Sequence, residues 1–197
     1  MKEKCTSPKP QLKEIIDTDA ILQSGNTKIC ILAGVGAGKS TWVEEVLATR
    51  GNVLWVTSRR IPVEQVTSKK QSVFSKKHRP EISNNQTHVT NAQLEGIVKD
   101  YMEKDRSNLD EFISCYDFVV VDEAHSLVAD SDFAKSSMTV LYFAEYVSTY
   151  IKKPVILMTG TPEPIQKYLD KNDWHIYNFL EDCRYVHPDT VYFTRKN

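Results

Sequence analysis

Short apolar runs alternate along the chain with longer segments in which apolar residues recur at helical spacing. Four of these runs are mainly continuous, which is typical of strands buried on both faces of a parallel sheet, and a fifth segment, at 87–90, is a weaker strand candidate. They span residues 28–33, 52–57, 87–90, 118–121 and 154–158. The intervening segments predict helices over about 39–49, from about Asn91 and over 130–151. We therefore expect an α/β fold, a mostly parallel sheet with helices on both faces.

The N-terminal segment carries a weaker pattern. Residues 1–10 hold two prolines and many polar groups, which is typical of a loose leader. Residues 12–24 show a rough helical stripe and predict one short helix, and Gly25-Asn26 predicts a turn after it. Gln11 and Gln23 lie here without the flanking pattern of an adenine-reading motif, so the base specificity stays open.

Several aromatic residues are predicted to belong to the core. Trp55 lies in the middle of a predicted strand, where packing is a better explanation than base stacking. Tyr142, Phe143, Tyr146 and Tyr150 recur at helical spacing, and we expect them to pack against the sheet.

Length and composition indicate one globular domain, since 41% of the 197 residues are apolar and 26% are charged. No apolar run approaches the roughly 20 residues of a membrane-spanning helix, and the first residues lack an apolar signal core. The four cysteines are far apart, which excludes a zinc ribbon or a disulfide framework and favours reduced thiols. We therefore expect a cytoplasmic protein without membrane contact.

Glycines cluster directly after the first predicted strand. Residues 33–40 read AGVGAGKS, the phosphate-binding pattern GxxxxGK[ST] with alanine at its first position. Glycines let the backbone amides turn toward one point, Lys39 would reach the β- and γ-phosphates, and Ser40 would bind Mg²⁺. A chance glycine-rich turn is the alternative, but the strand before it and the amphipathic helix after it favour a nucleotide site. The predicted binding residues are Gly34, Val35, Gly36, Ala37, Gly38, Lys39, Ser40 and Thr41.

An acidic pair ends the strand at 118–121. Asp122 and Glu123 stand where the second half of such a nucleotide site is expected. Asp122 would hold Mg²⁺ through its water shell, and Glu123 would orient and deprotonate the attacking water. The alternative is a strand followed by a helix whose first turn favours acids. With Lys39, these two carboxylates form the predicted catalytic set for ATP.

Three motifs together carry a family resemblance. They are AGVGAGKST at 33–41, VVVDEAH at 119–125 and TGTP at 159–162. In order and position they resemble the first RecA-like motor domain of superfamily-2 helicases and translocases, the DEAD/DEAH-box group. Gly160 stands where that family usually has alanine. A plain turn in which Pro162 starts a helix is the alternative for the third motif.

The resemblance implies a RecA-like P-loop NTPase fold and a division of the chain. Residues 1–24 would be the leader and short helix, 25–182 the ATP-binding domain, and 183–197 the start of a linker toward a second RecA-like domain. It also implies a coupling role for three residues, which would relay the γ-phosphate state to the nucleic-acid side. These residues are His125, Thr159 and Thr161.

A basic segment follows the second predicted strand. Residues 59–79 carry seven Lys or Arg and one acid, a net charge of +6 in a chain whose net charge is −1. Such a segment could line a phosphate-backbone track, or it could be a solvated loop that is basic by accident. The predicted nucleic-acid contacts are Thr57, Ser58, Arg59 and Thr90.

These observations predict an ATP- and Mg²⁺-dependent helicase domain that acts on nucleic acid, DNA in preference to RNA. The chain would be incomplete as a motor without a second RecA-like domain, so weak ATP hydrolysis is expected of it alone. The alternatives are a single-domain nucleotide switch or binding module and a packaging-type ATPase.

Overall fold

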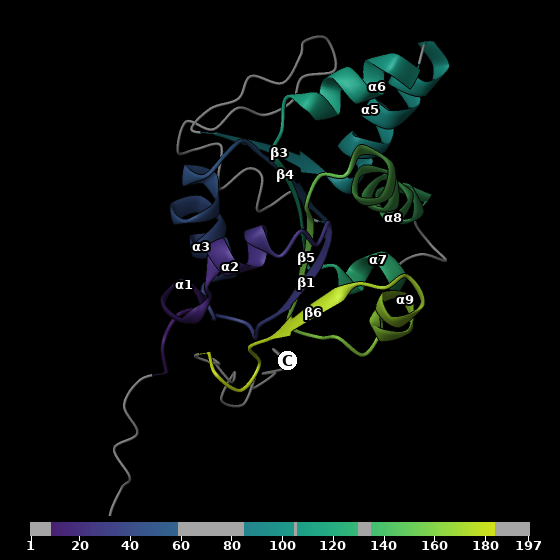
Figure 1. Ribbon diagram of the computed structural model, residues 1–197. Coiled ribbons are helices and arrows are strands. Elements are labelled where there is room, and N and C mark those ends of the chain that lie inside the picture. The colour runs from purple at the N-terminus through teal and green to yellow at the C-terminus, as the bar shows by residue number, and fades with distance from the viewer. Residues whose placement is uncertain (1–8, 59–84, 105, 130–134, 184–197) are drawn as a thin grey trace, which may run out of the picture.

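The computed structural model describes residues 9–58, 85–104, 106–129 and 135–183 (Figure 1). Within these ranges the chain forms one six-stranded sheet in which every pairing is parallel. Its strands are β1 (Lys28–Leu32), β2 (Val53–Thr57), β3 (Gln86–Thr90), β4 (Phe118–Asp122), β5 (Val155–Thr159) and β6 (His175–Asn178). They lie in the order β3-β2-β4-β5-β1-β6, which confirms the expected α/β class.

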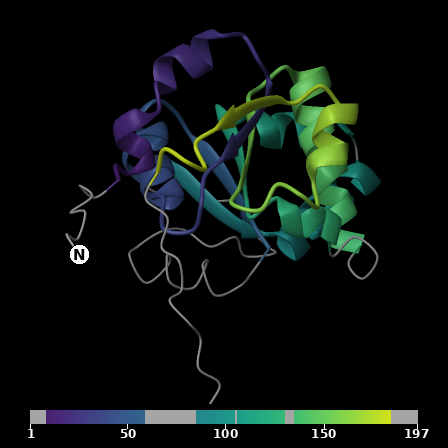
Figure 2. The same cartoon turned by 90° about the horizontal axis from the view of Figure 1, so that it is seen from below.

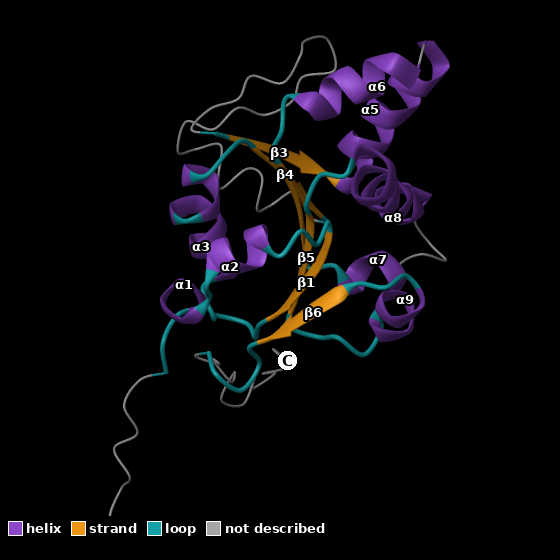
Figure 3. Cartoon of the chain, in the orientation of Figure 1, coloured by secondary structure: helices purple, strands orange, loops and turns teal. Residues whose placement is uncertain are grey.

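Helices cover both faces of the sheet, as the ribbon coloured by secondary structure shows (Figure 3). One face carries α1 (Leu12–Ile15), α2 (Thr18–Gln23), α3 (Lys39–Glu45) and a 3-10 turn at Leu47–Thr49. The other carries α5 (Asn91–Lys104), α6 (Arg106–Ser114), α7 (His125–Ala129), α8 (Lys135–Tyr146), a π-helical turn at Val147–Ile151, and α9 (Gln166–Lys171). Figure 2 shows the two layers from below. None of the described helices is long and apolar enough to cross a membrane.

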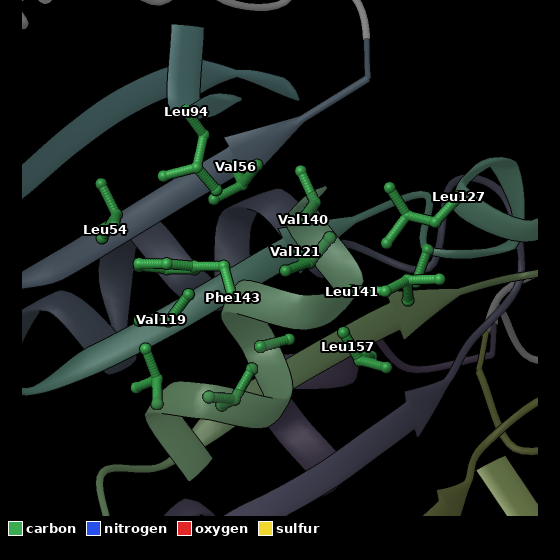
Figure 4. Packing of buried hydrophobic residues seen from close by; sticks show 14 of the residues in the cluster. Leu54, Val56, Leu94, Val119, Val121, Leu127, Val140, Leu141, Phe143 and Leu157 are labelled. Carbon is green, nitrogen blue, oxygen red and sulfur yellow. The ribbon is translucent and has the colours of Figure 1, made fainter. Parts of the chain in front are cut away.

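The pleat of each strand divides its side chains between two cores. In β4, Phe118 and Val120 pack with α1–α3, whereas Val119 and Val121 pack with the helices of the opposite face. Successive residues of a strand point to opposite faces, so a continuous apolar run is what a sheet covered on both sides needs. Figure 4 shows Phe143 of α8 close to β2 and β4 in the larger core.

The predicted helix over 12–24 is two helices, and the reason is local. Ile16 is extended, and the Asp17 side chain accepts a hydrogen bond from the Ala20 amide at 3.0 Å. This N-cap starts α2 anew, because the carboxylate satisfies an amide that a continuous helix would bond internally. The elements that were not predicted are α6, α7, α9 and β6. The edge strand β6 has no buried residue and lacks the continuous apolar run that marks β1, β2, β4 and β5.

The prediction for the aromatic residues of α8 is partly wrong. Phe143 is buried as expected, but Tyr142 is 69% exposed and Tyr150 is 73% exposed. The buried stripe includes Val140, Leu141, Phe143, Ala144 and Val147, which lie on one side of the helix. Tyr146 is half-buried against the same core, whereas Tyr142 and Tyr150 lie off this stripe. Regular spacing alone does not tell which face of the helix meets the sheet. Trp55 is buried, as predicted.

Truncation of a residue in the central strand tests the packing. Leu157 of β5 is fully buried in the larger core, so Leu157→Ala should lower the free energy of unfolding by about 2–5 kcal/mol. Met102 on α5 is 54% exposed, so Met102→Ala should change it far less. Urea denaturation of both variants measures this difference, and equal losses would contradict the described core.

Candidate functional site

Strand register brings the predicted motifs to one edge of the sheet. Thr57 at the end of β2 pairs with both Thr90 and Asp122, and Leu32 at the end of β1 pairs with Thr159. The strand β5 lies between β1 and β4. The turn after β5 is therefore flanked by the loop that follows β1 and the acidic pair that ends β4. In open parallel sheets, ligands bind at this carboxyl edge.

The loop between β1 and α3 adopts a tight conformation that depends on glycine. Gly36 and Gly38 have φ angles of 76° and 86°, in the left-handed region that residues with a Cβ rarely adopt. The Ala37 amide donates to the Gly34 carbonyl at 3.2 Å, and the Leu12 amide donates to the Ala37 carbonyl at 2.7 Å. The second of these hydrogen bonds connects the N-terminal segment to the loop and restrains the loop backbone.

Lys39 is the first residue of α3, and its side chain turns back under the loop. Its Nζ donates to the carbonyl oxygen of Ala33 at 2.9 Å and to that of Gly34 at 3.2 Å. The side chain is buried, with 8% of the residue exposed. An ammonium group has three N–H donors, so two backbone carbonyls orient it and leave capacity for a ligand.

An open pocket of about 360 Å³ lies over this loop. Among the described residues it is lined by Gln11, Val35, Gly36, Gly38, Lys39, Ser40, Thr41, Asp122 and Glu123. All but the first of these were predicted from the sequence. Ala37 is fully buried beneath the pocket, and Gly34 is not part of the lining.

Gln11 is the lining residue to which the sequence assigned no role. Its side chain lies near Gly38, where an added Cβ would come within 3.5 Å of the glutamine Cβ. A capping interaction holds its backbone, because the Gln11 amide donates to the Glu14 carboxylate at 3.1 Å. Nothing in the local sequence indicates that residue 11 returns to a loop some 25 positions later, because that contact is made by tertiary packing.

Asp122 carries an unfavourable charge in this pocket. The pKa of Asp122 is raised to about 6, first by burial and then by the neighbouring Glu123 carboxylate, while Lys39 and the Glu123 amide act in the opposite direction. The amide donates to Asp122 Oδ1 at 3.0 Å. A carboxylate in this position favours a nearby cation, because the protein itself only partly compensates its charge.

The donor set at this edge suits Mg²⁺ bound together with phosphate. Ser40 offers a hydroxyl and Asp122 a carboxylate, both on the same pocket. Across the described ranges, no cluster of three or more His, Cys, Asp or Glu could hold a metal by itself. Mg²⁺ characteristically takes one or two protein oxygens and completes its shell with waters and substrate phosphates. Ser40 and Asp122 fit that mode.

The end of β4 links to the turn after β5. Glu123 has a φ of 51°, a left-handed value that is uncommon for a residue with a side chain. His125 Nδ1 lies 3.3 Å from the Glu123 carboxylate and 3.0 Å from the Thr159 hydroxyl. The Thr159 hydroxyl in turn contacts both the carbonyl and the amide of Thr161, at 3.2 and 3.0 Å. One chain of polar contacts therefore connects the acidic pair with the TGTP turn.

The predicted nucleic-acid residues are only partly described. Thr57 is 5% exposed, so its hydroxyl is not at the surface in this structure, whereas Ser58 and Thr90 are half-buried. Thr90 and Gln93 exchange hydrogen bonds that cap α5, at 2.8 and 3.2 Å. Arg59 and the rest of the basic segment lie outside the described residues.

Fold and site together define a helicase-type, RecA-like P-loop ATPase domain. Residues 4–164 match the family described as "Type III restriction enzyme, res subunit". The match covers most of the chain, so the protein belongs to this family, whose domain is a superfamily-2 helicase-like ATPase with a RecA fold. The match also includes the N-terminal helices that hold the phosphate loop. No curated protein matches the chain.

The raised pKa of Asp122 predicts a gain in stability when its charge is removed. The folded protein binds this proton more tightly than the unfolded chain, whose aspartate has the ordinary pKa of 3.8. Stability is therefore lost as the pH rises from about 4 through the folded pKa. Without Mg²⁺ and nucleotide, Asp122→Asn should raise the free energy of unfolding at pH 7 by about 1–3 kcal/mol.

Urea denaturation at pH 7 and at pH 4 measures this effect. The difference between Asp122→Asn and the parent protein should shrink toward zero at the lower pH, where Asp122 is protonated in the folded protein. Asp170→Asn on α9, an exposed carboxylate, serves as control. A stabilisation of the same size at both pH values would contradict the electrostatic origin.

Proposed function

We propose that this chain is the ATP-binding domain of a DEAH-box superfamily-2 helicase or translocase. It would couple Mg²⁺-ATP hydrolysis to unwinding of, or movement along, nucleic acid, with DNA favoured over RNA. The observation that carries this proposal is that Lys39, Ser40, Asp122 and Glu123 line one and the same pocket. Transfer of a phosphoryl group to water requires side chains of these kinds: a phosphate-loop lysine, a hydroxyl, a metal-binding carboxylate and a general base.

Each of these side chains has a distinct task in the proposed reaction. Lys39 and the loop amides would bind the β- and γ-phosphates, while Ser40 and Asp122 would hold the metal. The metal that these two residues would hold supplies positive charge against the negative charge that develops during the reaction. Glu123 would orient the attacking water and accept its proton. The left-handed backbone at Glu123 supports this role, because strained conformations in folded proteins cluster at functional sites.

The chain of contacts from Glu123 through His125 to Thr159 and Thr161 supports the proposed coupling role. A change at the γ-phosphate would shift the Glu123 carboxylate, which lies 3.3 Å from the histidine ring. The ring contacts the Thr159 hydroxyl, and this hydroxyl organises the backbone of the following turn. Through this turn, a change at the γ-phosphate would alter the contacts of the domain with a bound nucleic acid.

Catalysis by this domain would depend on a second RecA-like domain. In related phosphoryl-transfer enzymes an arginine supplied from another domain or protein raises the rate by about 10³–10⁵-fold. We therefore expect the 197-residue chain alone to bind nucleotide weakly, to hydrolyse it slowly and not to unwind a duplex.

Two substitutions separate nucleotide binding from hydrolysis. Lys39→Ala should abolish detectable ATP binding, because it removes the cation that meets the phosphates. Glu123→Gln should leave affinity within a few-fold and lower the hydrolysis rate by about 10²–10⁴-fold, the usual contribution of general acid–base catalysis. Calorimetric titration and single-turnover hydrolysis measure the two effects.

Lys13→Ala is the matched control for Lys39→Ala. Lys13 forms a surface ion pair with Glu45 at 2.7 Å and does not line the pocket, so its loss should leave ATP affinity unchanged. Equal affinity in the parent protein and Lys39→Ala would refute the proposed nucleotide site. Hydrolysis that responds to neither DNA nor RNA, even with a second domain joined, would favour a nucleotide switch instead.

Salt dependence tests the proposed nucleic-acid track. If the basic segment contacts phosphates, Arg59→Ala should weaken DNA binding and reduce the slope of log K against log salt by about 1. Lys99→Ala is the control, since the exposed Lys99 side chain on α5 pairs with Glu95. Titrations at several salt concentrations, with DNA and with RNA of one sequence, measure both slopes. Identical slopes for the Arg59 variant and the parent would remove Arg59 from the track.

A further inference from the structure

Gly160, in the turn after β5, lies against the start of the phosphate loop. A Cβ added at this position would be 3.2 Å from the carbonyl oxygen of Ala33 and 3.4 Å from the Cα of Gly34. Real Cβ atoms are seldom found so close to a neighbour. The φ of Gly160 is not in the left-handed region, unlike that of Gly36 or Gly38. In this structure glycine is therefore favoured by the space available and not by the backbone conformation, although the helicases that the chain resembles usually have alanine at this position.

The Ala33 carbonyl that faces Gly160 also holds Lys39. It accepts the shorter of the two hydrogen bonds from Lys39 Nζ, at 2.9 Å. The Ala33 amide donates to the Thr159 carbonyl at 3.0 Å, so the same residue is tied to the end of β5. Ala33 is fully buried. A side chain at Gly160 would press on the carbonyl of a residue whose amide is bonded to β5 and whose carbonyl binds Lys39.

We propose that Gly160 is a positioning residue for Lys39. Because Gly160 has no Cβ, the Ala33 carbonyl keeps its position and continues to bind the Lys39 ammonium. The remaining N–H of that ammonium can then donate to a phosphate. This inference rests on the proposed function only in assigning the ligand as a nucleoside triphosphate. The positioning of Lys39 by Ala33 and Gly160 stands on geometry that is independent of the ligand.

The chain offers a matched control for a glycine-to-alanine change. Gly96 lies within α5, and a Cβ added there would meet nothing within 4 Å. Both Gly96→Ala and Gly160→Ala add one methyl group without demanding a left-handed backbone. Only the second brings that methyl group against the carbonyl that binds Lys39.

The first measurement observes Lys39 directly in the nucleotide-free protein. The NMR signal of its side-chain Cε–Hε group, in lysine-labelled protein, is assigned by its disappearance in Lys39→Ala. Gly160→Ala should shift this signal, and Gly96→Ala should leave it unchanged. Thermal unfolding of each variant verifies that it is folded. An unchanged Lys39 signal in folded Gly160→Ala would overturn the proposal, whatever happens to affinity.

The second measurement is the affinity for ATP with Mg²⁺. A carbonyl displaced by a few tenths of an ångström weakens a hydrogen bond to a charged group, so Gly160→Ala should bind ATP roughly three- to tenfold more weakly. Gly96→Ala should bind as the parent does. Unchanged or tighter binding by Gly160→Ala would overturn the proposed positioning. Failure of the parent itself to bind ATP, with the Lys39 signal still shifted by Gly160→Ala, would instead refute the proposed function.

Discussion

The parallel pairing of β5 with both β1 and β4 is the constraint on which the site depends. The phosphate loop follows β1 and the acidic pair ends β4, and these strands are not neighbours in the sheet. They are held at a fixed separation by β5, which is in register with each of them. The Ala33 amide extends this pairing one residue beyond β1, to the Thr159 carbonyl. A slip of one residue would therefore separate Lys39 from Asp122 and also exchange the two cores.

The site concentrates unfavourable features that the rest of the domain must compensate. Asp122 is a carboxylate whose pKa burial raises, Glu123 has a left-handed backbone, and Lys39 is a buried cation. Each of these three features by itself lowers the stability of the folded protein. Two cores of fully buried aliphatic and aromatic side chains, one on each face of the sheet, supply the stabilisation. A rigid parallel sheet thus allows a polar pocket at its edge.

Sequence patterns predict best where one physical requirement acts on neighbouring residues. Burial on both faces favours continuous apolar runs, and these mark four of the six described strands, namely β1, β2, β4 and β5. The phosphate loop needs glycine at positions with a left-handed φ, and its spacing shows this without any tertiary information. Gln11 at the pocket and the close approach of Gly160 to Ala33 depend on contacts between distant segments. The exposed Tyr142 could not be predicted either, because spacing does not tell which face of a helix meets the sheet.

The charges of the described pocket bear on how the domain would work. Its lining holds one cationic side chain, Lys39, and two carboxylates, Asp122 and Glu123. A nucleoside triphosphate with one bound Mg²⁺ would still bring a net negative charge, so backbone amides and one lysine would face an excess of anions. In the proposed function this excess would weaken nucleotide binding, because like charges accumulate in the pocket. A cationic group supplied from outside these residues would correct the excess, and it would do so most strongly when charge develops on the γ-phosphate. The electrostatics of the site would thus give a physical reason for the proposed dependence on a second domain, with hydrolysis at full rate only when both domains close on the nucleotide.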